Sequence, residues 1–297
     1  MQALAVLCSD LHLSHNPPVA RSGEQSWYAA MERPLNEMKW LAHKLQVPIV
    51  CAGDLLDKPQ QQPEFVNWAM DHVPFMFSIS GQHDTVSHRL DQLHKSAYRT
   101  LDKAGTIEDI GHGSVEYEGL SYMRFFGFPW GVEIESPIRY QGFNLAVVHQ
   151  FVWTDEVNRH AGAGEDKYLR SFAKKCESFD AVVIGDNHCS WISGKFINCG
   201  TFLRRKSDER QYKPMIGILY EDGTIKPHYL DCSQDKFLDD DVIVRQAESA
   251  MGDLSGFVNE LRLLGMDALD FRQAIKHRMD QMDVDRKVRE LVMEVMQ

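Results

Sequence analysis

Short apolar runs alternate with amphipathic segments along the first half of the chain, an order that is typical of βαβ units. Three apolar runs have the length of strands, and the segments between them carry apolar residues at helical spacing. Between Trp27 and Leu45, for example, an apolar residue recurs every three or four positions. The pattern predicts buried strands at 3–8, 47–52 and 75–80 and helices at about 24–45, 64–72 and 90–103.

The apolar period changes to two after Gly113. Apolar and polar residues alternate on both sides of Gly119, which predicts a hairpin in a second sheet. The pair Asp222-Gly223 separates the last two predicted strands and is a strong hairpin signal. Further strands are predicted at 143–149, 181–184, 196–198, 215–220 and 226–230.

The composition changes again after about Cys232, where strand patterns stop and amphipathic helices are predicted. Asp253 and Asp267 are placed to cap two of these helices. The chain is therefore expected to contain a main domain, 1–232, and a helical C-terminal extension, 233–297. The apolar stripes of the extension must be buried against the main domain, a second copy of the chain or a partner protein.

The charge balance excludes one class of function. The 297 residues include 32 basic and 43 acidic side chains, a formal net charge of −11. Such a chain does not coat nucleic acid or an anionic membrane by bulk charge, although a local basic groove remains compatible with it. No apolar run approaches the roughly 18 residues of a membrane span. The six cysteines form no Cys-x-x-Cys pair, so we expect reduced thiols and a cytoplasmic protein without membrane association.

Candidate metal ligands directly follow five of the predicted strands. Loops at the carboxyl ends of strands form the ligand crevice in open α/β sheets, so these side chains are expected to meet. Carboxylates and imidazoles together suit divalent Mn, Fe or Zn, and a shared carboxylate can bridge two ions about 3.5–4 Å apart. The five segments are Asp10-Leu-His12, Gly53-Asp54, Gly81-Gln-His-Asp84, His149 and Gly185-Asp-Asn-His188.

The order of these segments resembles that of the calcineurin-like metallophosphoesterases, from residue 3 to about residue 230. The resemblance implies an α/β fold, a two-sheet β-sandwich flanked by helices, here with the helical C-terminal extension. It also implies two divalent ions. Asp10, His12 and His188 would bind the first ion, Asp54 would bridge both, and His149 would bind the second.

The same resemblance assigns catalytic roles. His83 is similar to the catalytic histidine that lies near the leaving-group oxygen, and Asp84 would orient its ring. Two positions depart from the family pattern. Gln82 stands where the family has asparagine, and Asp186 where it has a histidine. Both offer oxygen atoms to the second ion. Because carboxylate and amide oxygens suit harder ions, we expect manganese, with magnesium, iron or zinc as alternatives.

Within the family, two segments are similar to the SbcD-type DNA-repair nucleases: Phe126-Gly-Phe-Pro-Trp130 and Asn198-Cys-Gly-Thr201. This narrower resemblance implies DNA as substrate and an SbcC-like ATPase partner, with a homodimer as another possible assembly. A basic loop follows the second segment and offers phosphate contacts, although a solvated loop explains it equally well. Its basic residues are Arg204, Arg205, Lys206 and Arg210.

The expected activity is metal-dependent phosphodiester hydrolysis by a DNA nuclease, an exonuclease or endonuclease, that uses a water activated by two metal ions. One alternative is a phosphoesterase that acts on a nucleotide, a cyclic nucleotide or a phosphoprotein. A second alternative is a catalytically degenerate scaffold that binds partners through its C-terminal helices. The departures at Gln82 and Asp186 favour the scaffold, whereas the remaining polar residues at the strand ends favour the enzyme.

Overall fold

The computed structural model describes residues 1–119, 121–135, 140–155, 157–159, 163–239 and 242. The chain divides into two units, Met1–Phe237 and Leu238–Gln297. The first unit contains all strands and helices described below. The helices predicted for the extension lie outside the described residues, so the predicted boundary at 232/233 stays a prediction. Among the described residues, no helix is long and apolar enough to cross a membrane.

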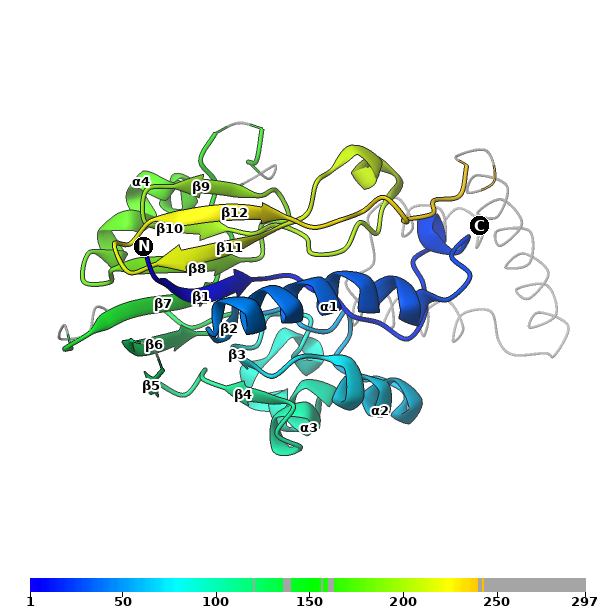
Figure 1. Ribbon diagram of the computed structural model, residues 1–297, viewed down its shortest axis with the longest axis horizontal. Coiled ribbons are helices and arrows are strands. Elements are labelled where there is room, and N and C mark those ends of the chain that lie inside the picture. The colour runs from blue at the N-terminus through cyan, green and yellow to red at the C-terminus, as the bar shows by residue number, and fades with distance from the viewer. Residues whose placement is uncertain (120, 136–139, 156, 160–162, 240–241, 243–297) are drawn as a thin grey trace, which may run out of the picture. The chain divides into compact units, whose positions relative to one another are not determined.

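Six strands form the first sheet in the order β12-β11-β1-β2-β3-β4 (Figure 1). Strands β1 to β4 run parallel to one another, whereas β11 is antiparallel to β1 and to β12. The β11–β12 hairpin turns at Asp222-Gly223 as predicted, with Gly223 at a φ of 81°. The strands are β1 (Ala3–Cys8), β2 (Ile49–Cys51), β3 (Met76–Ser78), β4 (Ile107–Asp109), β11 (Met215–Tyr220) and β12 (Ile225–Tyr229).

Six further strands form the second sheet in the order β5-β6-β7-β8-β10-β9. Strands β6, β7, β8 and β10 are parallel, and antiparallel strands β5 and β9 close the two edges. The strands are β5 (Ser114–Glu118), β6 (Tyr122–Phe128), β7 (Phe143–His149), β8 (Ala181–Gly185), β9 (Trp191–Ser193) and β10 (Phe196–Asn198).

The longest described helix, α1 (Trp27–Leu45), lies along β1 and β2 in Figure 1. It begins where the Ser26 side chain accepts a hydrogen bond of 3.2 Å from the Ala29 amide, and it ends at Gln46 in the left-handed conformation. The other α-helices are α2 (Pro63–His72), α3 (Ala97–Lys103) and α4 (Leu169–Phe172). Short 3₁₀ segments are η1 (Val19–Arg21), η2 (Val86–His88), η3 (Leu90–Lys95), η4 (Glu165–Lys167), η5 (Ala173–Cys176) and η6 (Ser207–Gln211).

Side chains alternate across the strands and build three apolar layers. In β1, Val6 and Cys8 face helices α1 to α3, while Ala5 and Leu7 pack in the layer between the two sheets. The outer face of the second sheet packs on α4 through residues such as Phe172. The predicted two-sheet α/β sandwich flanked by helices is therefore confirmed for the described residues.

The element predictions differ from the structure at a few places. The helix predicted at 90–103 is two elements, because Ser96 is extended and its side chain accepts from the Arg99 amide, which starts α3. Strands β4 and β9 are not predicted, because only one of the three residues in each is buried and so no buried apolar run marks them. The predicted start of α1 at about Glu24 is three residues early, because Ser26 is the cap.

Candidate metal centre

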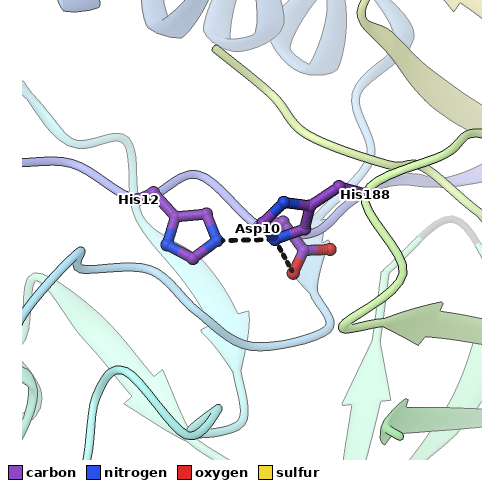
Figure 2. A group of neighbouring side chains, drawn as sticks. All are labelled: Asp10, His12 and His188. Carbon is purple, nitrogen blue, oxygen red and sulfur yellow. Dashed lines mark hydrogen bonds and ion pairs between the residues drawn. The ribbon is translucent and has the colours of Figure 1, made fainter. Parts of the chain in front are cut away.

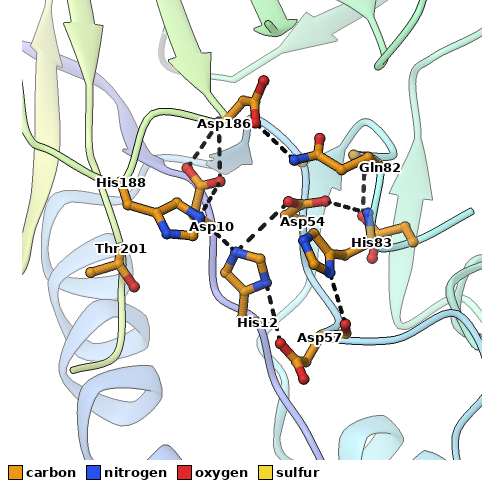
Figure 3. Close-up of polar contacts among 12 residues, drawn as sticks. Asp10, His12, Asp54, Asp57, Gln82, His83, Asp186, His188 and Thr201 are labelled. Atoms are coloured by element: carbon orange, nitrogen blue, oxygen red, sulfur yellow. Dashed lines mark hydrogen bonds and ion pairs between the residues drawn. The ribbon is translucent and has the colours of Figure 1, made fainter. Parts of the chain in front are cut away.

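Loops that follow β1, β2, β3, β7 and β8 bring their polar side chains to one place in the structure. Figure 3 labels those from the segments after β1, β2, β3 and β8, which point toward one another from separate parts of the chain. Strands β1, β2 and β3 are parallel within the first sheet, and β7 and β8 within the second, so each sheet gathers its loops at one edge. Hydrogen bonds from Gln82 to Asp186 and to His149 join the two edges. Both sheets therefore contribute to a single site.

The loops approach one another too closely for ordinary side chains. A Cβ atom at Gly81 would overlap the Asp54 carboxylate, and one at Gly53 would overlap the His149 ring. Four site residues with side chains adopt left-handed backbone conformations that are rare outside glycine. Such strain persists only where the surrounding structure enforces it, and it concentrates at functional sites. These residues are Asp10 (φ 51°), His12 (φ 46°), Asp54 (φ 51°) and Asp186 (φ 86°).

Asp10, His12 and His188 form one cluster of potential ligands (Figure 2). The Nε2 atoms of His12 and His188 are 3.1 Å apart, and His188 Nε2 lies 3.9 Å from Asp10 Oδ1. Asp10 and His12 are fully buried, whereas the His188 side chain is 30% exposed. The cluster is thus anchored in the interior and reaches solvent through His188.

Asp10, Asp54 and His149 form a second cluster, and all three are fully buried. Asp54 lies between the clusters, because its Oδ2 atom is 3.7 Å from His12 Nε2 and 3.5 Å from His149 Nε2. The other carboxylate oxygen, Oδ1, accepts a hydrogen bond of 2.9 Å from the His83 amide. One Asp54 oxygen therefore lies within 3.7 Å of a histidine from each cluster.

Gln82 and Asp186, the two departures from the family pattern, contact each other. Gln82 Nε2 donates a 2.8 Å hydrogen bond to Asp186 Oδ1, which turns Gln82 Oε1 toward His149 Nε2 at 2.7 Å. The opposite ring nitrogen, Nδ1, lies 2.6 Å from the Ala52 carbonyl oxygen and must donate to it. In a neutral His149 ring, Nε2 is then a lone pair that faces an oxygen lone pair.

This arrangement fits a divalent cation. Three lone-pair atoms, from Gln82, His149 and Asp54, converge where a neutral ring supplies no proton. Asp54 Oδ2 is also a buried oxygen for which the described residues offer no hydrogen-bond donor. A buried polar atom without a partner is costly, and a cation removes that cost. The donor set of carboxylate, amide and imidazole is the one that suits divalent transition metals.

Burial and neighbouring charges shift the pKa values of Asp10, Asp54 and His149. Burial, reinforced by the neighbouring Asp54 charge, raises the pKa of Asp10 to about 8. Burial also acts to raise the pKa of Asp54, but contacts with His149, His12 and His83 outweigh it and lower that pKa. Conversely, burial acts to lower the pKa of His149, whereas Asp54, Asp10 and Asp186 raise it well above its ordinary value. In the metal-free protein a proton on His149 Nε2 is therefore favoured at the place that a cation fits, and the two would compete for it.

In the first cluster the histidine pKa values are lowered, in contrast to that of His149. Burial, followed by the positive charge of Arg205, lowers the pKa of His12 well below its ordinary value. Burial and the charges of Arg205 and Lys206 lower the pKa of His188 to about 4. Both rings are therefore neutral at physiological pH, which is the state that binds metals.

The structure corrects one role that the sequence resemblance implied. Asp84 was expected to orient the His83 ring, but its carboxylate accepts from the backbone amides of Leu55, Leu56 and Gly81 at 2.9–3.2 Å. The His83 ring is instead oriented by the Asp57 carbonyl oxygen, 3.0 Å from Nδ1. Asp84 is fully buried and ties the loop after β2 to the loop after β3, so its contribution is to position both loops.

Asp57 is a site residue that the sequence analysis missed. Its Oδ1 atom lies 3.7 Å from His12 Nδ1 and forms an ion pair with Arg205. With His12 and His83 it forms a third cluster of potential ligands among the described residues. The available signal was its position three residues after Asp54 in the same strand-end segment.

The basic loop does not act as one unit. Arg204 donates to Asp235 and to the carbonyl oxygens of Arg210 and Cys232 at 2.6–2.9 Å, so its guanidinium is engaged inside the protein. Arg210 packs over the Phe237 ring at 5.7 Å. Arg205 and Lys206 lie close enough to the cluster to lower the pKa of His188. Of the four predicted phosphate contacts, these two are placed near the metal ligands.

Comparisons with known proteins are limited to distant structural likeness. No family model and no curated protein sequence matches this chain. A calcineurin-like phosphoesterase, YfkN from Bacillus subtilis, aligns at 11% identity with a TM-score of 0.46, over 84% of this chain and 96% of that chain. An archaeal phosphodiesterase aligns at 12% identity with a TM-score of 0.36, over 76% of this chain and 99% of that chain. A 5'-nucleotidase from Candida albicans SC5314 aligns at 11% identity with a TM-score of 0.47, over 84% of this chain and 58% of that chain. Likenesses at this level carry no conclusion about substrate or reaction.

Proposed function

We propose that the protein hydrolyses phosphodiesters with two bound divalent metal ions, and that it belongs with the metallophosphoesterases. The observation that carries the proposal is the buried Asp54 carboxylate between His12 and His149, with an oxygen atom that lacks a donor. Two clusters that share Asp10 surround it. A scaffold that only binds partners has no use for buried carboxylates whose pKa values are shifted this far.

The residues divide into ligands and a proton donor. The ions would be held by Asp10, His12, Asp54, Gln82, His149 and His188. Asp186, predicted from the sequence as a further ligand, is in none of the ligand clusters of the described residues and would instead fix the Gln82 amide. Two divalent ions at such a site lower the pKa of water and neutralise charge on the phosphoryl oxygens. The His83 ring donates through Nδ1 to the Asp57 carbonyl, so Nε2 would give a proton to the departing oxygen from the doubly protonated, imidazolium form of the ring, which becomes neutral in the step.

DNA is the proposed substrate. The support is electrostatic, because Arg205 and Lys206 place positive charge beside the first cluster in a chain whose net charge is −11. A local cationic patch of this kind can hold the phosphate next to the scissile one. An assay with manganese against bis-p-nitrophenyl phosphate and labelled single- and double-stranded DNA tests the proposal.

Hydrolysis of both the small diester and DNA is the expected result. Turnover of the small diester alone would support the alternative of a nucleotide or cyclic-nucleotide phosphoesterase. Failure to hydrolyse any phosphoester with manganese, magnesium, iron or zinc would contradict the proposal and support a degenerate scaffold. The ATPase partner and the homodimer rest on the C-terminal extension, outside the described residues, and stay predictions, as does the cytoplasmic location.

A further inference from the structure

A row of rings leads away from the metal ligands through His83. The His83 ring centroid lies 4.8 Å from that of His12 on one side and 6.2 Å from that of His88 on the other. The His88 ring in turn lies 6.1 Å from Trp130, with an angle of 56° between the two planes. His88 is exposed and Trp130 is partly exposed. The proposed function uses neither of these outer two rings.

The His88 ring is held in place at an energetic cost. Ser87 and His88 both have left-handed backbone conformations, with φ of 56° and 53°. Left-handed backbone is strained at residues other than glycine and persists where the surrounding structure enforces it. The enforcing contact is between His88 Nδ1 and the Gln82 carbonyl oxygen, 3.1 Å apart. The ring therefore sits beside the loop that carries Gln82 and His83.

Trp130 is tied to the same loops from the opposite direction. Its amide donates to the Ser80 carbonyl at 3.1 Å, directly before the loop of Gln82 and His83. The turn that carries Trp130 is also fastened by Gln150, the residue after His149, whose Nε2 donates to the Val132 carbonyl at 2.8 Å. The backbone that carries the indole is thus anchored to the ends of β3 and β7, two strands that supply metal-site residues.

We propose that the His88–Trp130 ring pair forms a subsite for the nucleobase on the leaving-group side of the scissile phosphate. This inference rests on the proposed function, in which His83 faces the departing oxygen. The part of the substrate beyond that oxygen must then lie on the His88 side of His83, where two ring faces are available. Planar bases stack on such rings without sequence preference. The subsite therefore selects substrates with a nucleobase over phosphoproteins and simple diesters.

The test compares dinucleoside monophosphates with analogues that lack one base. An abasic tetrahydrofuran residue replaces the nucleoside on one side or the other, and the product that keeps the phosphate identifies the leaving side. In the wild type, removal of the leaving-side base should lower kcat/KM by about 5- to 150-fold, the range that stacking on an aromatic residue provides. In Trp130→Ala this preference should vanish, because the rate on the dinucleoside monophosphate falls to that on the abasic analogue, which has no leaving-side ring to stack.

Matched variants separate a ring contact from a loss of folding. Trp130→Phe should keep most of the preference, and His88→Ala should reduce it in part. Trp40→Ala and His94→Ala are the controls and should leave it intact. Trp40 is 56% exposed near the end of α1, just before β2 begins and so at the opposite end of that strand from Asp54. His94 is exposed and has the same kind of Nδ1-to-carbonyl contact as His88.

Two outcomes would overturn the inference while leaving the proposed function intact. One is an unchanged base preference in Trp130→Ala; the other is hydrolysis of bis-p-nitrophenyl phosphate by a wild type that shows no base preference. If no phosphoester is hydrolysed, the proposed function fails. The subsite is then tested separately by calorimetry, which measures the binding of nucleotides to the protein in the presence of manganese. Tighter binding of a nucleoside monophosphate than of deoxyribose phosphate, lost in Trp130→Ala, would support the subsite. Equal binding would reject it.

Discussion

Two groups of buried charges in this protein differ in how their carboxylates are compensated. The metal-site cluster consists of Asp10, His12, Asp54 and His149, where carboxylates approach one another and Asp54 Oδ2 has no donor among the described residues. The Arg21 cluster consists of Arg21, Glu24, Arg33, Arg204 and Asp235, where positive and negative groups alternate. Arg21 is 1% exposed and pairs with Glu24 at 2.5 Å and with Asp235 at 2.9 Å.

The Arg21 cluster also uses aromatic packing. The Arg21 guanidinium lies 5.0 Å from the Phe237 ring centroid and 5.5 Å from that of Trp27. It joins the segment before α1 to the segment after β12. Its carboxylates already have arginine partners, although Arg21 Nε itself has no hydrogen-bond partner among the described residues. The comparison shows that buried charge by itself does not mark a functional site. Buried carboxylates that lie close together among histidine lone pairs do, because a bound cation removes the cost of burying them.

The largest expected effect comes from Asp10→Asn, which removes a carboxylate that both metal clusters share. Activity should fall below detection with any of the four metals. The metal-free protein should nevertheless become more stable, since burial disfavours the Asp10 charge and asparagine can still accept from the Asp186 amide. Rates and melting in EDTA measure the two changes. A less stable metal-free variant would contradict the view that the buried Asp10 carboxylate destabilises the metal-free protein.

His83→Ala should lower turnover by about 10²–10⁴-fold without changing the metal content, because a positioned proton donor contributes that much. The loss should be smallest for bis-p-nitrophenyl phosphate, whose departing group needs little help from a proton. Elemental analysis and rates on alkyl and aryl diesters check both statements. Loss of the metals, or a wild-type rate on alkyl diesters, would show that the role of His83 is wrong.

Arg21→Met should lower the free energy of unfolding by about 3–5 kcal/mol, because it leaves buried carboxylates without their cation. The folded fraction should keep its activity within a factor of two, since no metal ligand is touched. Arg33→Met is the matched control and should cost less, as its side chain is 27% exposed. Denaturant unfolding measures the stability of both variants, and hydrolysis rates at denaturant concentrations below the unfolding transition measure their activity. Equal losses of stability in the two variants would argue against a special role for the burial of Arg21.

Asp186→Ala should weaken binding of the second ion by about 10–100-fold, the usual effect of removing a group that orients a ligand. The first ion should be retained, because Asp10, His12 and His188 are unchanged. Titration of manganese by calorimetry distinguishes the two ions. Two ions bound with wild-type affinity would mean that Gln82 does not depend on Asp186 for its orientation.

The smallest expected effect is a difference in the pH dependence of stability. The Asp10 pKa is raised from 3.8 to about 8, so the folded metal-free protein keeps a proton that the unfolded chain loses. Its contribution to stability therefore falls as pH rises through this range. Burial acts to raise the pKa of Glu24, but the Lys236 amide and Arg21 outweigh it and lower that pKa. The Glu24 contribution is therefore present above 4.5, its ordinary pKa, and is lost as pH falls below it.

These opposite slopes are measured by subtraction. The unfolding free energy of Asp10→Asn in EDTA, minus that of the wild type, should grow as pH rises from acid to weakly alkaline values. The corresponding loss in Glu24→Gln should be constant near neutrality and disappear in acid. Parallel slopes for the two variants would show that the clusters do not differ in the way their charges are compensated.

Most of the site's membership was predictable from the sequence because each ligand directly follows a buried strand. Asp10, Asp54, His149 and His188 are marked in this way, since a parallel strand delivers whatever comes next in the chain to the shared edge. The strand and helix order, with a second sheet after Gly113, was predictable because the apolar period distinguishes strands from helices, whereas the packing of two sheets into a sandwich came from the family resemblance. Strands β4 and β9 have one buried residue each and so leave no apolar run in the sequence.

Only the tertiary structure decided which of these groups contact one another. Gln82 and Asp186 are 104 residues apart in the chain, and Arg205 pairs with Asp57 across 148 residues. No local pattern encodes such pairs, because they depend on how the two sheets pack and on left-handed turns that the loops adopt only in the folded protein. For the same reason two neighbours in one basic run have different surroundings. Arg204 pairs with Asp235, whereas Arg205 pairs with Asp57 beside the metal ligands.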